Sequence, residues 1–147
     1  MLKNSIALLC LFSASAATAQ MNSSDLKWGP APGVFPKGAQ MAVLSGNPGT
    51  SGTFTVRLKM PAGYAIAAHS HPTDELVTVI SGDLSLGMCD RLDRAKSAML
   101  HAGGFANAPA KMNHYAFTTS GAVVQIIAEG PFAITYVNPA DDPTGRH

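Results

Sequence analysis

Two histidines separated by one residue, His69 and His71, are the first feature of this chain that suits a chemical role. In an extended strand, side chains two positions apart project from the same face. The two imidazoles can therefore converge on one ion. Imidazole nitrogen binds most divalent transition metals in proteins. The pair predicts one side of a metal site.

A carboxylate and a third histidine can complete that site. Residues 72–74 read as a turn, after which Glu75 opens the next strand-like run. His114 lies 43 residues after His71, just before another such run. Three imidazoles and one carboxylate suit Fe, Mn, Ni, Cu or Zn and leave coordination positions open for water or substrate.

Taken singly, these residues are weaker signals. A lone histidine is more often a surface or hydrogen-bonded core residue than a ligand, and Glu75 alone would be a solvated charge at a strand end. His101 is expected in a surface loop, and Tyr64 and Tyr136 in the core or at its rim. No paired carboxylates and no nucleophile motif stand out, so catalytic residues stay unassigned.

The elements that must position these groups are short strands. Residues 53–60 alternate polar and apolar side chains, as half-buried strands do. Further strand-like runs lie at 64–68, 75–80, 84–88, near 105, and at 115–118, 122–128 and 132–137. Short strands with turn signals every 8 to 12 residues or so predict an all-β sandwich or barrel and not a parallel βαβ sheet.

Two local predictions concern the connections. The centre Ser81-Gly82-Asp83, between apolar runs, predicts a tight hairpin. Residues 91–99 lack Gly and Pro and space apolar residues at three and four, which makes them the one helical candidate, of one or two turns.

The N-terminus has the features of a secretory signal peptide over residues 1–19. A short positive start precedes an apolar stretch that is too short to span a bilayer. The small residues Ala17-Thr18-Ala19 place cleavage after Ala19. We therefore expect a periplasmic or secreted protein that is not held in the membrane after cleavage; an uncleaved anchor is the alternative.

The mature chain divides into three parts. Residues 20–40 are rich in Pro and Gly and predict an extended N-terminal arm, tethered by Trp28 and Phe35. Residues 41–138 form the β-barrel domain, and residues 139–147 form a loose C-terminal tail.

Composition excludes several function classes. The 147 residues are 46% hydrophobic and 13% charged, with a formal net charge of +1. A disordered protein needs lower hydrophobicity and higher net charge, and a nucleic-acid binder usually shows a basic excess. Without the leader, Cys89 is the only cysteine, so an intrachain disulfide cannot form. We expect Cys89 to be a small buried hydrophobe.

The spacing of the histidines and glycines resembles the two sequence motifs of the cupin superfamily. Positions of the first motif are held by Gly63, His69, His71, Glu75 and Gly82. Positions of the second are held by Gly103, Pro109 and His114, with 20 residues between the motifs. Phrases beginning at Phe54 and Thr135 are also similar to those of small exported cupins without an assigned reaction.

Two positions depart from the second motif, which carries Gly where this chain has Lys111 and Asn where it has Thr118. That Gly serves a turn that can require positive φ, where a lysine would cost about 1 kcal/mol, so we expect this turn to differ slightly. Neither position is a ligand in the family. We expect Lys111 to be a solvated loop residue; the less favoured alternative is a role toward an anionic substrate at the barrel mouth.

The resemblance implies a single-domain cupin β-barrel, the double-stranded β-helix or jelly-roll type. It also implies that one divalent transition metal ion, Fe or Mn before Zn, Ni or Cu, binds inside the barrel. By this analogy the ligands are His69, His71, Glu75 and His114. The family resemblance further implies a homodimer, to which an intersubunit sheet at residues 54–60 could contribute.

Two functions stay open at this point. The first is a metal-dependent oxidoreductase, with dioxygenase as the leading subclass, acting on a small organic molecule. The second is a non-catalytic periplasmic module that holds a metal or ligand; a non-redox lyase or isomerase is a further alternative. Strand alternation places Ala65, Ala67, Val77 and Val79 beside the ligands. This predicts an apolar pocket of small residues.

Overall fold

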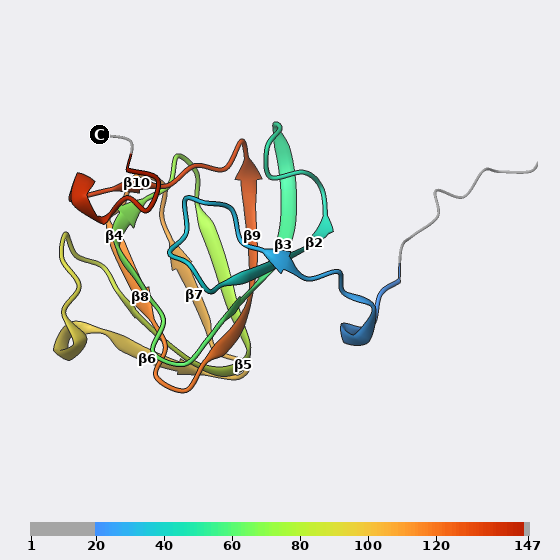
Figure 1. Cartoon of the computed structure of the whole chain (residues 1–147), viewed down its shortest axis with the longest axis horizontal. Helices are drawn as coiled ribbons and strands as arrows, with labels where there is room; N and C mark the ends of the chain where they lie inside the picture. The colour runs from blue at the N-terminus through green and yellow to red at the C-terminus, as the bar shows by residue number, and fades with distance from the viewer. Residues whose placement is uncertain (1–19, 146–147) are drawn as a thin grey trace, which may run out of the picture.

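The computed structural model describes residues 20–145, and the chain folds there as a β-barrel (Figure 1). The predicted signal peptide and its cleavage site lie outside these residues. The ten strands are β1 Gly29–Pro30, β2 Gln40–Ser45, β3 Gly52–Met60, β4 Ala65–Ser70, β5 Glu75–Gly87, β6 Ala98–His101, β7 Phe105–Ala108, β8 His114–Phe117, β9 Ala122–Gly130 and β10 Thr135–Tyr136. Three short 3-10 helices accompany them: η1 Ser23–Asp25, η2 Arg94–Lys96 and η3 Pro139–Asp141.

The strands join in the order β1-β2-β3-β9-β5-β8-β4-β10, and both β6 and β7 pair with β5. Every pairing among the described residues is antiparallel. The all-β prediction is therefore confirmed. Within the described range, no helix is long and apolar enough to cross a membrane.

Strand β5 connects the two halves of the barrel. Its first part pairs with β7 and β9, and its last part pairs with β6 and β8. The predicted hairpin at Ser81-Gly82-Asp83 is therefore wrong, because the strand continues through it to Gly87. Gly82 has a φ of 78°, and the register with β9 shifts between Val79 and Ser81. The Gly-Asp signal thus marks a bulge, which local sequence does not distinguish from a tight turn.

The helix predicted over residues 91–99 is mostly absent. Only η2 forms, with the Asp93 side chain accepting the Ala95 N–H at 3.0 Å. The following residues, Ala98–His101, form β6 instead, paired with the end of β5. Pairing with the open edge of β5 is more favourable here than a helix of one or two turns, so these residues form a strand.

Strand β3 confirms the period-two pattern. Its side chains Phe54, Val56, Leu58 and Met60 point into the core and are at most 3% exposed. Burying each contributes roughly 1.5–3 kcal/mol. Both edges of β3 are occupied, by β2 and by β9. The suggested intersubunit sheet at residues 54–60 is therefore wrong, because no edge of this strand is free.

The N-terminal arm lies against the barrel, as its aromatic residues predicted. The ammonium group of Lys59 lies 4.7 Å from the centre of the Trp28 ring. Phe35 is buried and stacks on Phe132, with ring centres 5.9 Å apart. Cys89 is exposed. The expectation that it is buried is wrong, because it lies two residues beyond the end of β5 and outside the sheet.

Candidate metal centre

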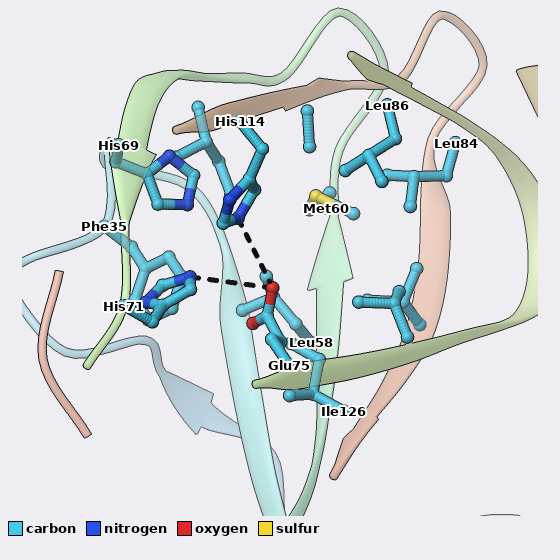
Figure 2. A pocket seen from close by; sticks show the side chains of 14 residues that line it. Phe35, Leu58, Met60, His69, His71, Glu75, Leu84, Leu86, His114 and Ile126 are labelled. Atoms are coloured by element: carbon cyan, nitrogen blue, oxygen red, sulfur yellow. Dashed lines mark ion pairs between the residues drawn. The ribbon is translucent and has the colours of Figure 1, made fainter. Parts of the chain in front are cut away.

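Three neighbouring strands bring the candidate ligands together. His69 lies in β4, His71 just beyond its end, and Glu75 and His114 are the first residues of β5 and β8. His69 and His114 are directly paired across β4 and β8. All four side chains are buried, with exposures of 3%, 5%, 7% and 1% in the order of the chain. Figure 2 shows them converging on one side of a pocket.

A bulge in β4 sets which residues accompany the histidines. The register between β4 and β8 shifts between Ile66 and His69. Because of this extra residue, Ile66 lines the pocket, and Ala65 and Ala67 do not. The prediction for Ala65 and Ala67 is therefore wrong, since simple alternation fails across a bulge. On β5 the prediction is confirmed for Val77 and wrong for Val79, which is buried but does not line the pocket.

The three imidazoles form a compact cluster. Ring centres are 4.9 Å apart for His69 and His71, 4.4 Å for His69 and His114, and 5.1 Å for His71 and His114. One ring nitrogen of each histidine lies within 4.8 Å of the other two. Oε2 of Glu75 is 3.6 Å from Nε2 of His71 and 3.6 Å from Nε2 of His114 (Figure 2). Such a cluster can bind a metal ion.

Backbone carbonyls fix the orientation of each imidazole. Nδ1 of His69, His71 and His114 lies 2.6, 2.8 and 3.0 Å from the carbonyl oxygens of Ala67, Ala133 and Met112. A carbonyl only accepts, so each Nδ1 carries the proton and donates it. The lone pair of each neutral ring is then on Nε2, the atom that faces the cluster. This carbonyl contact is the usual outer partner of a metal-binding histidine.

Two polar atoms of the cluster lack a hydrogen-bond partner. These are Nε2 of His71 and Nε2 of His114, both fully buried. Leaving a buried acceptor unsatisfied costs about 1–3 kcal/mol. A cation between the rings would satisfy both atoms and balance the charge of Glu75. The residues present therefore fit a divalent metal ion.

The protonation states follow from burial and from Glu75. Burial, together with the neighbouring His114, lowers the pKa of His69 to about 3. Burial also acts to lower the pKa of His71, but the carboxylate of Glu75, 3.6 Å from its Nε2, outweighs burial and raises it. Burial alone would raise the pKa of Glu75, yet the imidazoles of His114 and His71, each 3.6 Å from its Oε2, lower it. Glu75 is thus an anion that requires a positive partner.

The pocket around the cluster is narrow and apolar. Its cavity is about 30 Å³, enough for one or two waters. Ten side chains line it besides the four polar ones: Phe35, Leu58, Met60, Ile66, Val77, Leu84, Leu86, Ala116, Val124 and Ile126. The apolar prediction is confirmed, but the wall consists mostly of larger side chains than predicted. This excludes bulk water from the cluster.

The two departures from the second motif have structural roles. Lys111 has a φ of 64° and is the one non-glycine residue with positive φ in the described chain. Its N–H donates to the carbonyl of His71 at 2.8 Å, while its side chain is exposed. Thr118 is fully buried, and its hydroxyl accepts the Gly121 N–H at 3.0 Å. Lys111 therefore adopts the positive φ typical of glycine, and the expectation that the turn would differ to avoid it is wrong.

The remaining polar candidates lie outside the cluster. His101 is exposed on β6, in agreement with its predicted surface position. Tyr64 and Tyr136 are buried, and their hydroxyls donate to the carbonyls of Pro36 and Val34 at 2.6 and 2.8 Å. They hold the arm against the barrel and line no part of the pocket.

Sequence reasoning missed Phe35 and Phe132 as site residues. Phe35 had been assigned only a tethering role, but its ring lines the pocket. The ring of Phe132 lies 4.9 Å from that of His71. Neither has a motif or a spacing that ties it to the histidines, because they come from the arm and from the segment after β9.

Comparison with known families now places the chain. Residues 14–135 match the family described as Domain of unknown function (DUF4437). The chain belongs to this family. Since the match includes all four candidate ligands, the buried cluster lies inside the DUF4437 domain. Comparison with curated proteins gives no match.

Solved structures establish the fold of this DUF4437 protein. The polyketide cyclase RemF from Streptomyces resistomycificus is 16% identical, with a TM-score of 0.70 over 86% of this chain and 89% of that one. A candidate acetylacetone dioxygenase from Methylibium petroleiphilum PM1 is 22% identical, with a TM-score of 0.64 over 97% and 90%. An RmlC-like cupin from Shewanella frigidimarina NCIMB 400 is 16% identical, with a TM-score of 0.58 over 74% and 87%.

These likenesses show that the fold is the double-stranded β-helix of cupins, so the predicted fold is confirmed. At such low identity they do not determine the reaction. The printed names cover different chemistries, cyclisation and dioxygenation among them. The function must be argued from the site.

Proposed function

We propose that this protein is a metal-dependent oxidoreductase that acts on a small organic molecule, with dioxygenation as the leading reaction. The ligands would be Nε2 of His69, His71 and His114 together with the carboxylate of Glu75. A bound Fe(II) or Mn(II) ion would supply electron transfer with O2 and Lewis acidity toward substrate oxygens.

One observation carries this proposal. Among the described residues that line the pocket, the four candidate ligands are the only ones with a hydroxyl, amide, amine, imidazole or carboxylate group. Acid–base, hydrolytic or nucleophilic catalysis needs a separate proton donor, base or nucleophile within reach of substrate. With hydrocarbon and one thioether as the rest of the wall, the chemistry must come from the ion.

The chain's own residues have three tasks in such a reaction. The carbonyls of Ala67, Ala133 and Met112 keep the imidazoles neutral at Nε2 and fix their directions. The carboxylate of Glu75 would offset one positive charge of a bound ion, which favours a divalent cation over a neutral molecule at this site. The apolar wall excludes water and so protects reactive species from side reactions. The 22% identical candidate acetylacetone dioxygenase supports dioxygenation as the first reaction to test.

The small size of the cavity favours one alternative, a module that holds a metal without turnover. A cavity of about 30 Å³ accepts O2 or water beside an ion but no larger organic molecule unless a wall moves.

Anaerobic loading with Fe(II) followed by oxygen-consumption measurements separates the two functions. Small diketones, phenols and thiols form the substrate panel. Oxygen uptake in proportion to one substrate supports the oxidoreductase. Tight metal binding with no uptake across the panel refutes it in favour of the holding module, and product without oxygen use indicates a lyase or isomerase.

A further inference from the structure

A second cavity lies on the other side of Phe35 from the histidine cluster. It measures about 200 Å³, compared with about 30 Å³ for the pocket around the histidines. The two cavities share Phe35 and Ile126 as walls. We call this second cavity the outer chamber, and its other walls include Met41, Val43 and Phe132.

The outer chamber is almost wholly apolar. Among the described residues that line it none is charged, and its one amide side chain, Asn47, already accepts the Gly49 N–H at 2.9 Å. Val43, which lines this chamber, is 51% exposed, so the chamber is open to solvent at this residue. An apolar cavity of about 150 Å³ is large enough to bind benzene. A chamber of about 200 Å³ therefore has room for one aromatic ring or a short branched alkyl group.

The partition between the two cavities is a side chain on a fixed backbone. Tyr136 and Tyr64 donate to the carbonyls on either side of Phe35, those of Val34 and Pro36. The Phe35 N–H donates to the carbonyl of Pro32 at 2.9 Å. The backbone around the partition is thus held at three points. The phenyl group, a side chain with two rotatable bonds, separates the chamber from the histidines together with Ile126 and with Phe132, whose ring centre lies 4.9 Å from that of His71.

We propose that the outer chamber is the binding site for the apolar group of an amphiphilic substrate, whose oxygen-bearing end passes Phe35 to reach the histidine cluster. The substrate class is a small carboxylate, enol or phenol that carries one ring-sized hydrocarbon group. This also explains how a pocket too small for a substrate can serve one, because only the polar end has to enter it. The position of the oxygen-bearing end rests on the proposed function; the chamber itself does not.

Toluene tests the chamber on the metal-free full chain. Ligand-observed NMR should detect toluene binding to the wild type. Val43→Trp fills the chamber and should weaken toluene binding by about tenfold or more, because toluene could then no longer bury its ring there. Ile80→Trp is the matched control, since Ile80 is also apolar and partly exposed, at 38%, but lines neither cavity. Absence of toluene binding, or equal binding by wild type and Val43→Trp, overturns the inference.

A gain-of-binding variant guards against misfolding as an explanation. Phe35→Ala removes one side chain of the partition and enlarges the space on both sides of it, so this variant should bind naphthalene more tightly than the wild type does. A wild-type circular dichroism spectrum in the near and far ultraviolet must accompany that gain, because partly unfolded proteins also bind aromatic molecules. Equal or weaker naphthalene binding by a folded Phe35→Ala protein contradicts the assignment of Phe35 as the partition.

Co(II)-loaded protein tests the link to the histidines, with its visible absorption spectrum as the readout. Phenylacetate should perturb the spectrum at about a tenfold lower concentration than acetate, and Val43→Trp should abolish the difference. Equal half-saturation by the two acids overturns the link. Failure of Co(II) to bind at all would refute the proposed function, whereas the toluene result decides the chamber in either case.

Discussion

Replacing Glu75 with Gln should weaken metal binding strongly while leaving the fold intact. The substitution keeps the size of the side chain but removes the only anion of the cluster. Oε2 of Glu75 lies 3.6 Å from Nε2 of both His71 and His114. At an effective dielectric constant of about 20, one unit charge at that distance interacts with the carboxylate by about 4 to 5 kcal/mol. A divalent ion between these atoms would lose at least part of that attraction.

The expected loss is about 100-fold in affinity, or about 2.7 kcal/mol. Removing a group that only orients a ligand costs about 10- to 100-fold, and removing a charged ligand should cost no less. At a metal concentration about 1,000 times the wild-type Kd, bound metal stabilises the wild type by about 4.1 kcal/mol. The variant, at about 10 times its own Kd, would gain only about 1.4 kcal/mol. The rise in Tm on adding metal should therefore be about 10 °C smaller.

Isothermal titration with Co(II) or Mn(II) and thermal unfolding with and without metal measure both quantities. Glu129→Gln is the matched control, because Glu129 is the other glutamate of the chain and is exposed on β9. It should retain wild-type affinity. If Glu75→Gln bound metal as tightly as the wild type, the assignment of Glu75 as a ligand would be refuted.

The same variant should shift the pH dependence of metal binding. Glu75 raises the pKa of His71 above 6.5, although burial opposes it. Metal binds the neutral imidazole, so wild-type affinity falls as pH drops through this raised pKa. Without the carboxylate, only the hydrogen bond to the Ala133 carbonyl still opposes burial, so the pKa of His71 should be lower than in the wild type. The variant should bind more weakly at pH 8 yet lose less of its affinity between pH 8 and pH 6.

Three further substitutions test the supports of the site by chemical denaturation. Lys111→Gly should stabilise the protein by about 1 kcal/mol, because glycine relieves the positive φ of 64°; a decrease would contradict the strain. Asp83→Asn should destabilise at neutral pH, since hydrogen bonds, chiefly from the Ser120 hydroxyl, lower the pKa of Asp83 from 3.8 to about 2. The advantage of wild type should be present above pH 3.8 and vanish as pH falls through about 2, and a pH-independent difference would contradict this. Tyr136→Phe removes the donor to the Val34 carbonyl and should lower the free energy of unfolding by about 1 kcal/mol. An unchanged free energy of unfolding would contradict this contact between the arm and the barrel.

The sequence predicted that the candidate ligands lie together because most of their spacing is local. His69 and His71 are two positions apart, and Glu75 follows a short turn, so strand geometry alone brings them close. The position of His114 followed from the second motif. The alternation of residues 53–60 predicted which side chains of β3 form the core.

The tertiary structure alone decided how these pieces are connected and enclosed. Bulges in β4 and β5 changed which face of each strand points inward, and a bulge leaves no reliable trace in hydrophobic period. The edge of β5 turned Ala98–His101 into a strand where local spacing favoured a helix. Phe35 reaches the pocket because two tyrosine hydroxyls hold the arm across it. Such contacts join residues far apart in the chain, and their energy depends on packing that no local pattern encodes.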